Sequence, residues 1–195
     1  MFKKITKKGG MNQHDPYEKI PKARSFNLES DDLVDGGDMP APRLSKIAGI
    51  EVGSDKSPSL RWDGFDKRTK SFMVTCFDPD APIPSGFWHW CLYDIPLDIT
   101  ELEAGAGNPD KSKLPIGAKM LKNDAGFAGY IGAAPPPGTP HRYIFCVTAL
   151  GTPELQNVTE DSSIAFSTYM ALEHVLGRAF LTVSFKRDGV VELWC

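Results

Sequence analysis

The sequence lacks any run of apolar residues near the ~20 that a bilayer-spanning helix needs. The basic start, Met1–Lys8, has the charge of a secretion signal, but Gly9–Lys22 is polar where such a signal needs an apolar segment. We therefore expect a cytoplasmic protein with no transmembrane segment. Met11 is an alternative start of the chain, and the sequence does not decide between it and Met1.

A strong net charge is also missing. The formal charge is −3 at pH 7 and the sequence pI is about 5.8. A chain this acidic has no general electrostatic attraction for nucleic acid or for anionic lipid headgroups. Binding driven by overall charge, and with it a nucleic-acid partner, is therefore not expected.

Cysteine is sparse, and its spacing excludes the common cysteine motifs. The four cysteines (Cys76, Cys91, Cys146 and Cys195) form no Cys-x-x-Cys pair, so neither a zinc site nor a thioredoxin-like site is indicated. The first three lie in apolar runs and are predicted to be small buried hydrophobes. We expect no cofactor and no resident metal.

What is present fits one globular domain. A chain of 195 residues can bury a single sizeable core. Residues 1–24 have little periodicity and are predicted to form a flexible N-terminal arm. The domain is expected over 25–187, followed by a C-terminal tail at 188–195.

The interior is dominated by predicted strands. Alternating or continuous apolar runs bounded by Gly, Pro and Asp are typical of strands. They cover residues 25–29, 57–62, 71–77, 88–95, 142–150 and 180–185. Glu103–His141 is rich in Gly, Pro and Asn, so we predict mostly loop there, and a loop this long is usually functional. Many short strands with few helices favour an all-β sandwich.

One helix is predicted near the C-terminus. Asp161 or Ser162 could cap it. An apolar stripe at helical spacing would then follow, formed by Ala165, Tyr169, Leu172, Leu176 and Ala179. We interpret this as a packing helix.

Chemistry-bearing residues gather near the ends of the strands. Asp78-Pro79-Asp80-Ala81-Pro82 follows a buried strand directly, although Asp and Pro alone would indicate only a turn. In Gly86–Trp90, if Trp88 and Trp90 share one face of a strand, His89 takes the other. His89 is then either a core imidazole bonded to a carbonyl or a donor to an anion.

A third cluster spans Tyr130–Tyr143. Its consecutive prolines offer a stiff wall that needs no hydrogen bonds. His141 and Tyr143 are two apart, so both can project from one face of a strand. The other interpretation, a proline-rich partner motif, is disfavoured because the strand pattern resumes immediately.

The order of these motifs is more specific than any one of them. Ser-Pro-x-Leu-x-Trp, Asp-Pro-Asp-Ala-Pro, His-Trp, Tyr-x-Gly-x-x-Pro-Pro-x-Gly and His-Arg-Tyr follow one another between about Phe26 and Lys186. The series resembles the phosphatidylethanolamine-binding family, in its bacterial Raf-kinase-inhibitor-like branch. The resemblance implies a Greek-key antiparallel β-sandwich, with a large central sheet, a smaller sheet, and one or two short helices, one of them near the C-terminus.

The resemblance also implies a small anion pocket for phosphate, a phosphoryl headgroup, or a phosphorylated side chain or peptide end. By motif position its residues are Asp78, Asp80, His89, Pro135, Pro136, His141 and Tyr143. A kinase or serine protease as regulated partner, and a homodimer, are further implications of the family.

The expected mechanism is recognition without catalysis. His89 and His141 would donate hydrogen bonds to an oxyanion, and Tyr143 could add another. Asp78 or Asp80 would orient an imidazole or accept a bond from a ligand amine. The alternative is a metal-assisted hydrolase that uses the same Asp and His residues. No His-Glu-x-x-His or Gly-x-Ser-x-Gly motif supports that alternative.

Overall fold

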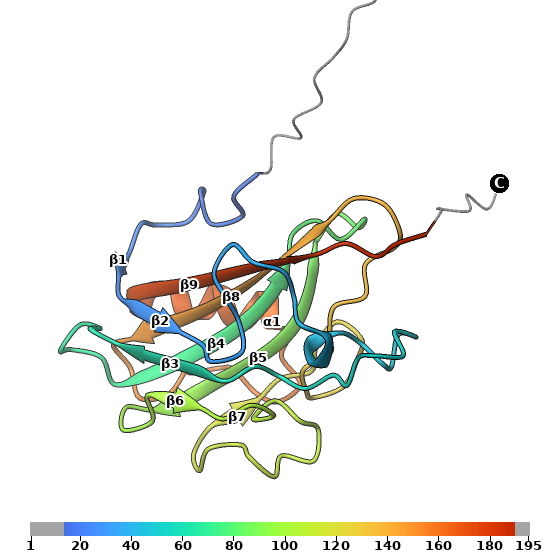
Figure 1. Cartoon of the computed structure of the whole chain (residues 1–195). Helices are drawn as coiled ribbons and strands as arrows, with labels where there is room; N and C mark the ends of the chain where they lie inside the picture. The colour runs from blue at the N-terminus through green and yellow to red at the C-terminus, as the bar shows by residue number, and fades with distance from the viewer. Residues whose placement is uncertain (1–13, 190–195) are drawn as a thin grey trace, which may run out of the picture.

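The computed structural model describes residues 14–189, which form two β-sheets and one short α-helix (Figure 1). The strands are β1 (Arg24–Ser25), β2 (Asn27–Glu29), β3 (Leu60–Asp63), β4 (Ser71–Asp78), β5 (Phe87–Pro96), β6 (Glu101–Leu102), β7 (Lys119–Met120), β8 (His141–Leu150) and β9 (Val175–Phe185). The helix is α1 (Ile164–Ala171), and two 3-10 turns lie at η1 (Ala41–Arg43) and η2 (Leu172–His174).

The large sheet has the strand order β1-β9-β8-β4-β5-β7, and the small sheet has the order β2-β3-β6. All pairings in the large sheet are antiparallel except that of β1 with β9, which is parallel. The chain leaves β5 on one side of β4 and returns as β8 on the other. This long return across β4 is the kind of connection that a Greek-key arrangement requires.

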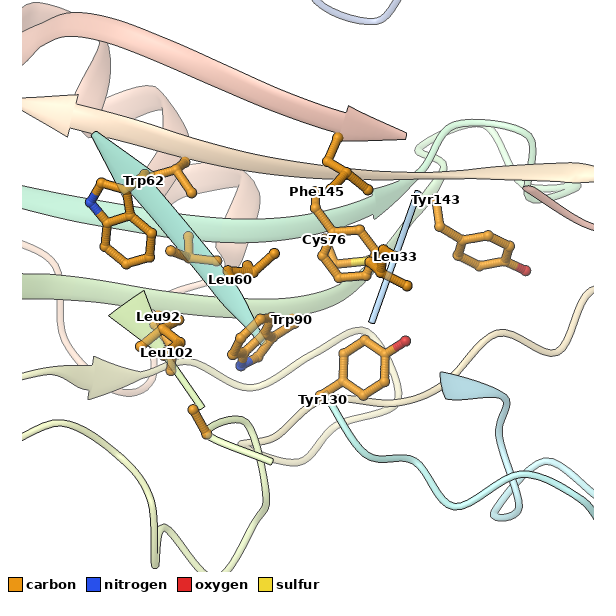
Figure 2. Close-up of a cluster of buried hydrophobic side chains, with 14 of the residues drawn as sticks. Leu33, Leu60, Trp62, Cys76, Trp90, Leu92, Leu102, Tyr130, Tyr143 and Phe145 are labelled. Atoms are coloured by element: carbon orange, nitrogen blue, oxygen red, sulfur yellow. The ribbon is translucent and has the colours of Figure 1, made fainter. Parts of the chain in front are cut away.

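The two faces of the large sheet are covered differently. In Figure 1 the small sheet lies in front of the large one and α1 lies behind it. Between the sheets, Trp62 of β3 packs edge-on against Phe72 of β4, with ring centroids 5.3 Å apart. Figure 2 shows this cluster, which also holds Leu60, Trp90 and Phe145. Burial of these apolar side chains, at ~1.5–3 kcal/mol each, joins the two sheets.

The predicted β-sandwich is confirmed, and the longer strands match closely. β4 is buried along its whole length, as its continuous apolar run predicted. Between Glu103 and His141 the structure has only β7 as a strand, so the prediction of a mostly irregular segment is also confirmed. Cys76, Cys91 and Cys146 are buried free thiols, while Cys195 lies outside the described residues.

The helix prediction was partly wrong. Ser163, not Asp161 or Ser162, caps α1, and its hydroxyl accepts a hydrogen bond from the Phe166 N–H at 3.1 Å.

The apolar stripe divides between two kinds of structure. Leu176 and Ala179 belong to β9, because the chain from Val175 onward pairs with β8 rather than extending the helix. Long-range pairing outweighs the local periodicity there. The helix therefore buries Ile164 and Ala171, while Tyr169 is exposed.

Part of the predicted N-terminal arm contacts the large sheet. Residues 1–13 and both alternative starts lie outside the described residues. Tyr17 packs on Phe180 of β9 with ring centroids 4.7 Å apart, and the Pro21 carbonyl accepts a hydrogen bond from Arg178. Within residues 14–189, no helix is both long and apolar enough to cross a membrane.

Candidate functional site

The three predicted motifs meet at one end of three adjacent strands of the large sheet. β4 ends at Asp78, while β5 begins at Phe87 and β8 begins at His141. Because β4 is antiparallel to both neighbours, its end lies beside their beginnings. These strand ends and the loop after Tyr130 enclose a cavity of about 240 Å³. Its wall is formed by Ala48, Asp78, Ala81, Pro82, Phe87, His89, Ile131, Gly132, Ala134, Pro135, Pro136, His141 and Tyr143.

His89 reaches the cavity because of a β-bulge. Cys76 pairs with Trp90 and Phe77 pairs with Trp88, so His89 is an extra residue without a partner on β4. The expected alternation fails here, since Trp90 lies in the core between the sheets while Trp88 packs on the helix side. The His89 ring instead turns toward Tyr143 on β8, with ring centroids 5.1 Å apart.

The His89 imidazole is held by Ile131 in a defined tautomer. Its Nδ1 lies 2.8 Å from the Ile131 carbonyl oxygen, which can only accept, so Nδ1 carries a proton. The His89 carbonyl in turn accepts a hydrogen bond from the Ile131 N–H at 3.0 Å. Burial lowers the pKa of this imidazole, although the Ile131 bond and the Asp78 charge act in the opposite direction.

His141 is held by Asp78. The His141 Nδ1 lies 2.7 Å from Asp78 Oδ2, and both side chains are more than nine-tenths buried. The other oxygen of Asp78 accepts a hydrogen bond from the Asp80 N–H at 2.8 Å. Both carboxylate oxygens are therefore bonded to donors, which offsets much of the negative charge they would present to a ligand.

Tyr143 supplies a hydroxyl with no assigned partner. Its ring is 1% exposed, and its oxygen has no hydrogen bond to any residue of the described chain. In Figure 2 this oxygen points away from the core cluster. Burial, and then the charge of Asp78, raise the pKa of the phenol well above its ordinary value, so it stays protonated.

Asp80 does not line the cavity. Its carboxylate binds the Arg142 side chain bidentately, with oxygens 2.7 Å from Nε and 2.8 Å from Nη2, and it also accepts a hydrogen bond from the Arg142 N–H. Burial would raise the pKa of Asp80, but the bonds to Arg142 outweigh this and lower it. Asp80 and Arg142 instead border a separate, proline-lined hollow beside the cavity.

The pair between Asp80 and Arg142 has a positioning role. Arg142 lies between His141 and Tyr143 on β8, so alternation places it on the other face of the strand. The pair ties the loop after β4 to the start of β8. Sequence reasoning did not single out Arg142, although its place in His-Arg-Tyr was a usable signal.

Pro135 and Pro136 both line the cavity, and the segment before them is held by close backbone packing. Ala133 exchanges backbone hydrogen bonds with Arg43 and Ser45, each at 3.0 Å. A Cβ on Gly132 would lie 2.3 Å from the Leu44 carbonyl carbon, so only glycine fits there. The wall therefore rests on residues 43–45, which the sequence motifs did not indicate.

Other cavity residues were also missed. Phe87 packs against His89 with the rings tilted and their centroids 4.8 Å apart, and its position two residues earlier on the strand was the available signal. Ala48 comes from a distant loop and had no sequence signal. Within residues 14–189, no group of three or more His, Cys, Asp or Glu side chains is arranged to hold a metal ion.

Comparisons with known proteins agree on one family. The profile of the family described as phosphatidylethanolamine-binding protein matches residues 29–186. The chain is 41% identical over 166 residues to the UPF0098 protein YbcL of Escherichia coli, covering 85% of this chain and 90% of that protein. It is also 41% identical to E. coli YbhB, over 83% of this chain and 100% of that protein.

Solved structures support the same relationship. The crystal structure of E. coli YbcL, described as a new member of the mammalian PEBP family, superposes with a TM-score of 0.80 at 40% identity. It covers 84% of this chain and 99% of that chain. A PEBP homolog of Chlamydia trachomatis superposes with a TM-score of 0.67 at 26% identity, over 85% of this chain and 100% of that one.

Proposed function

Since this chain belongs to the phosphatidylethanolamine-binding protein family, we propose that it is a non-catalytic ligand-binding protein whose cavity takes a small oxyanion, either phosphate or a phosphoryl group. One observation carries the proposal. His89 and His141 are each fixed through Nδ1, in one cavity with the hydroxyl of Tyr143.

The two imidazoles are arranged to become donors. With Nδ1 bonded to Ile131 or Asp78, the remaining ring nitrogen is Nε2, which has no protein partner within the described part of the chain. Neutral imidazole accepts at Nε2, and only the protonated ring donates from both nitrogens. An oxyanion would therefore bind together with a proton, and Tyr143 would add a neutral donor.

The acidic residue in the cavity does not prevent this. Asp78 already accepts from His141 and from the Asp80 N–H. Asp80 is neutralised by Arg142 and would act on the ligand only through the position of β8.

The cavity volume limits the ligand. About 240 Å³ is the volume of roughly eight water molecules at ~30 Å³ each. This fits a phosphoryl group with a short substituent, while the rest of a larger ligand would lie outside. A phosphorylated side chain on a kinase or protease partner would meet the same size limit. That partner, the homodimer and the cytoplasmic location stay predictions.

The test is a thermal-shift and calorimetric titration of the purified protein with sulfate, phosphate and phosphoethanolamine, beside zinc. Sulfate stays a dianion at neutral and mildly acidic pH. The pH dependence of its affinity therefore reports protonation of the protein alone. A ligand that binds the native state raises the melting temperature by mass action. We expect the oxyanions to stabilise the native protein. We expect their affinity to fall about tenfold or more in His89→Gln and in His141→Gln.

His174→Gln is the matched control, because His174 lies in η2 and does not line the cavity. Anion binding that survives both cavity substitutions would contradict the proposal. Stabilisation by zinc alone, lost in the same variants, would favour the metal-assisted alternative.

A further inference from the structure

A second cavity lies on the helix side of the large sheet, away from the oxyanion site. It has a volume of about 350 Å³. Met73 and Thr75 of β4 and Cys146 and Thr148 of β8 contribute to its lining. Side chains of α1 close another side, and residues 16–20 contribute Tyr17. Its surface is mostly apolar, as small-molecule sites usually are.

Arg178 places a positive charge in this apolar setting. The residue is 7% exposed and lines the cavity from β9, opposite Thr148 in the register. Its Nη1 donates to the Pro21 carbonyl at 2.9 Å, and this is its one side-chain hydrogen bond within residues 14–189. Over the same residues it forms no ion pair with a carboxylate.

A buried guanidinium of this kind favours an anionic ligand. Arginine stays charged at every accessible pH and has five N–H donors, which match a carboxylate bidentately. Buried charges in proteins are usually paired, because desolvation costs several kcal/mol when no counter-charge is present. The Pro21 carbonyl is neutral and satisfies one donor only. A carboxylate would supply the missing charge.

We propose that this cavity is a second binding site, which takes a small amphipathic monocarboxylate. The carboxylate pairs with Arg178, and the apolar body of the ligand lies against Met73 and the α1 side of the cavity. The hydroxyls of Thr75 and Thr148 are further polar groups of the lining. At ~30 Å³ for each water displaced, the volume suits a ligand of roughly a dozen non-hydrogen atoms.

The apolar lining of this second cavity disfavours the oxyanion that is proposed for the first site. A phosphate dianion would lose much of its hydration here and meet a single cation, whereas a monocarboxylate is fully matched by it. The two sites also use different residues of the same strands. Phe77 and Trp88 line this cavity, while their neighbours Asp78 and His89 line the other.

The probe is octanoate, titrated by calorimetry into the full chain, with 1-octanol as the neutral analogue. We expect saturable one-to-one binding of octanoate that weakens about tenfold or more in Arg178→Met, which keeps an apolar stem. Binding of 1-octanol is expected to be weaker and unchanged by that substitution. Arg68→Met is the matched control, because Arg68 is exposed and paired with Asp66.

A steric variant tests the site even if Arg178→Met does not fold. Ala165 is exposed and lines the cavity, so Ala165→Trp is expected to block octanoate. Phe166→Trp adds the same ring to the next exposed position, outside the lining, and is expected to leave binding intact.

Three results would overturn the proposal. They are no saturable octanoate binding, equal octanoate binding in native protein and Arg178→Met, and equal effects of the two tryptophan variants. His89→Gln separates this site from the first. This variant is expected to bind sulfate more weakly and octanoate as tightly as the native protein. The two proposals can therefore be contradicted independently.

Discussion

Asp78 and His141 form a buried pair that joins the end of β4 to the beginning of β8, with Oδ2 and Nδ1 2.7 Å apart. The same carboxylate holds the Asp80 N–H, so it organises both the imidazole and the loop that follows it. One side chain thus positions two parts of the candidate oxyanion site.

Asp78→Ala is expected to destabilise the fold. It leaves the His141 Nδ1 and the Asp80 N–H without their acceptor, and removal of one partner of a buried pair costs about 3 kcal/mol. Asp78→Asn keeps an acceptor oxygen and is expected to cost less. Urea denaturation gives both free energies of unfolding. Equal effects of the two substitutions would show that the bonds to this side chain do not matter.

Asp80 and Arg142 are expected to act as a unit. Because the pair is bidentate but partly exposed, we expect a coupling energy of about 1 kcal/mol in a double-mutant cycle of Asp80→Ala and Arg142→Ala. Sulfate affinity is expected to fall in each single variant and to fall little further in the double variant. Strictly additive losses would argue against the positioning role of this pair.

Gly132→Ala tests the wall of the cavity. The added Cβ would lie 2.3 Å from the Leu44 carbonyl carbon and 2.5 Å from the Ser45 nitrogen, so the backbone must move. We expect a loss of about 2 kcal/mol in stability, with weaker sulfate binding. Gly151→Ala is the control, since its nearest neighbour would be a leucine methyl at 3.5 Å. Similar melting temperatures for the two variants would contradict the prediction.

The sequence predicted the sandwich and the strands that carry the site, because continuous apolar runs such as Ser71–Phe77 leave few alternatives to a buried strand. It predicted the meeting of Asp78, His89, His141 and Tyr143 only through the family resemblance. The bulge that turns His89 toward Tyr143 depends on register with β4, which no local pattern encodes.

The remaining differences between expectation and structure have the same origin. Leu176 and Ala179 continue a helical stripe in the sequence but lie in a strand. The reason is that β9, with its eleven residues, pairs with β8 along its length. Asp80, predicted as an anion-pocket residue, pairs bidentately with Arg142 and borders the neighbouring hollow, so its part in ligand binding stays a prediction. In each case a residue distant in sequence determines where the side chain lies.

The lowered pKa of His89 predicts how stability depends on pH. An unfolded histidine titrates near ~6.5, and burial lowers the pKa of the folded one. Below about pH 6.5 the unfolded chain therefore binds the proton more readily than the folded chain does. Stability from this group is complete above that pH and falls as the pH drops toward the lowered value.

We expect the urea midpoint of the ligand-free protein to fall between pH 7.5 and 5.5, and to fall less in His89→Gln. Asp80, whose pKa is also lowered, contributes only as the pH approaches the ordinary aspartate range near ~3.9, below this window. His174→Gln is expected to keep the native slope. Saturating sulfate should reduce or reverse the slope, because the oxyanion binds the protonated imidazole. A slope that is unchanged in His89→Gln would assign the pH dependence to other groups and remove the basis for proton-coupled oxyanion binding.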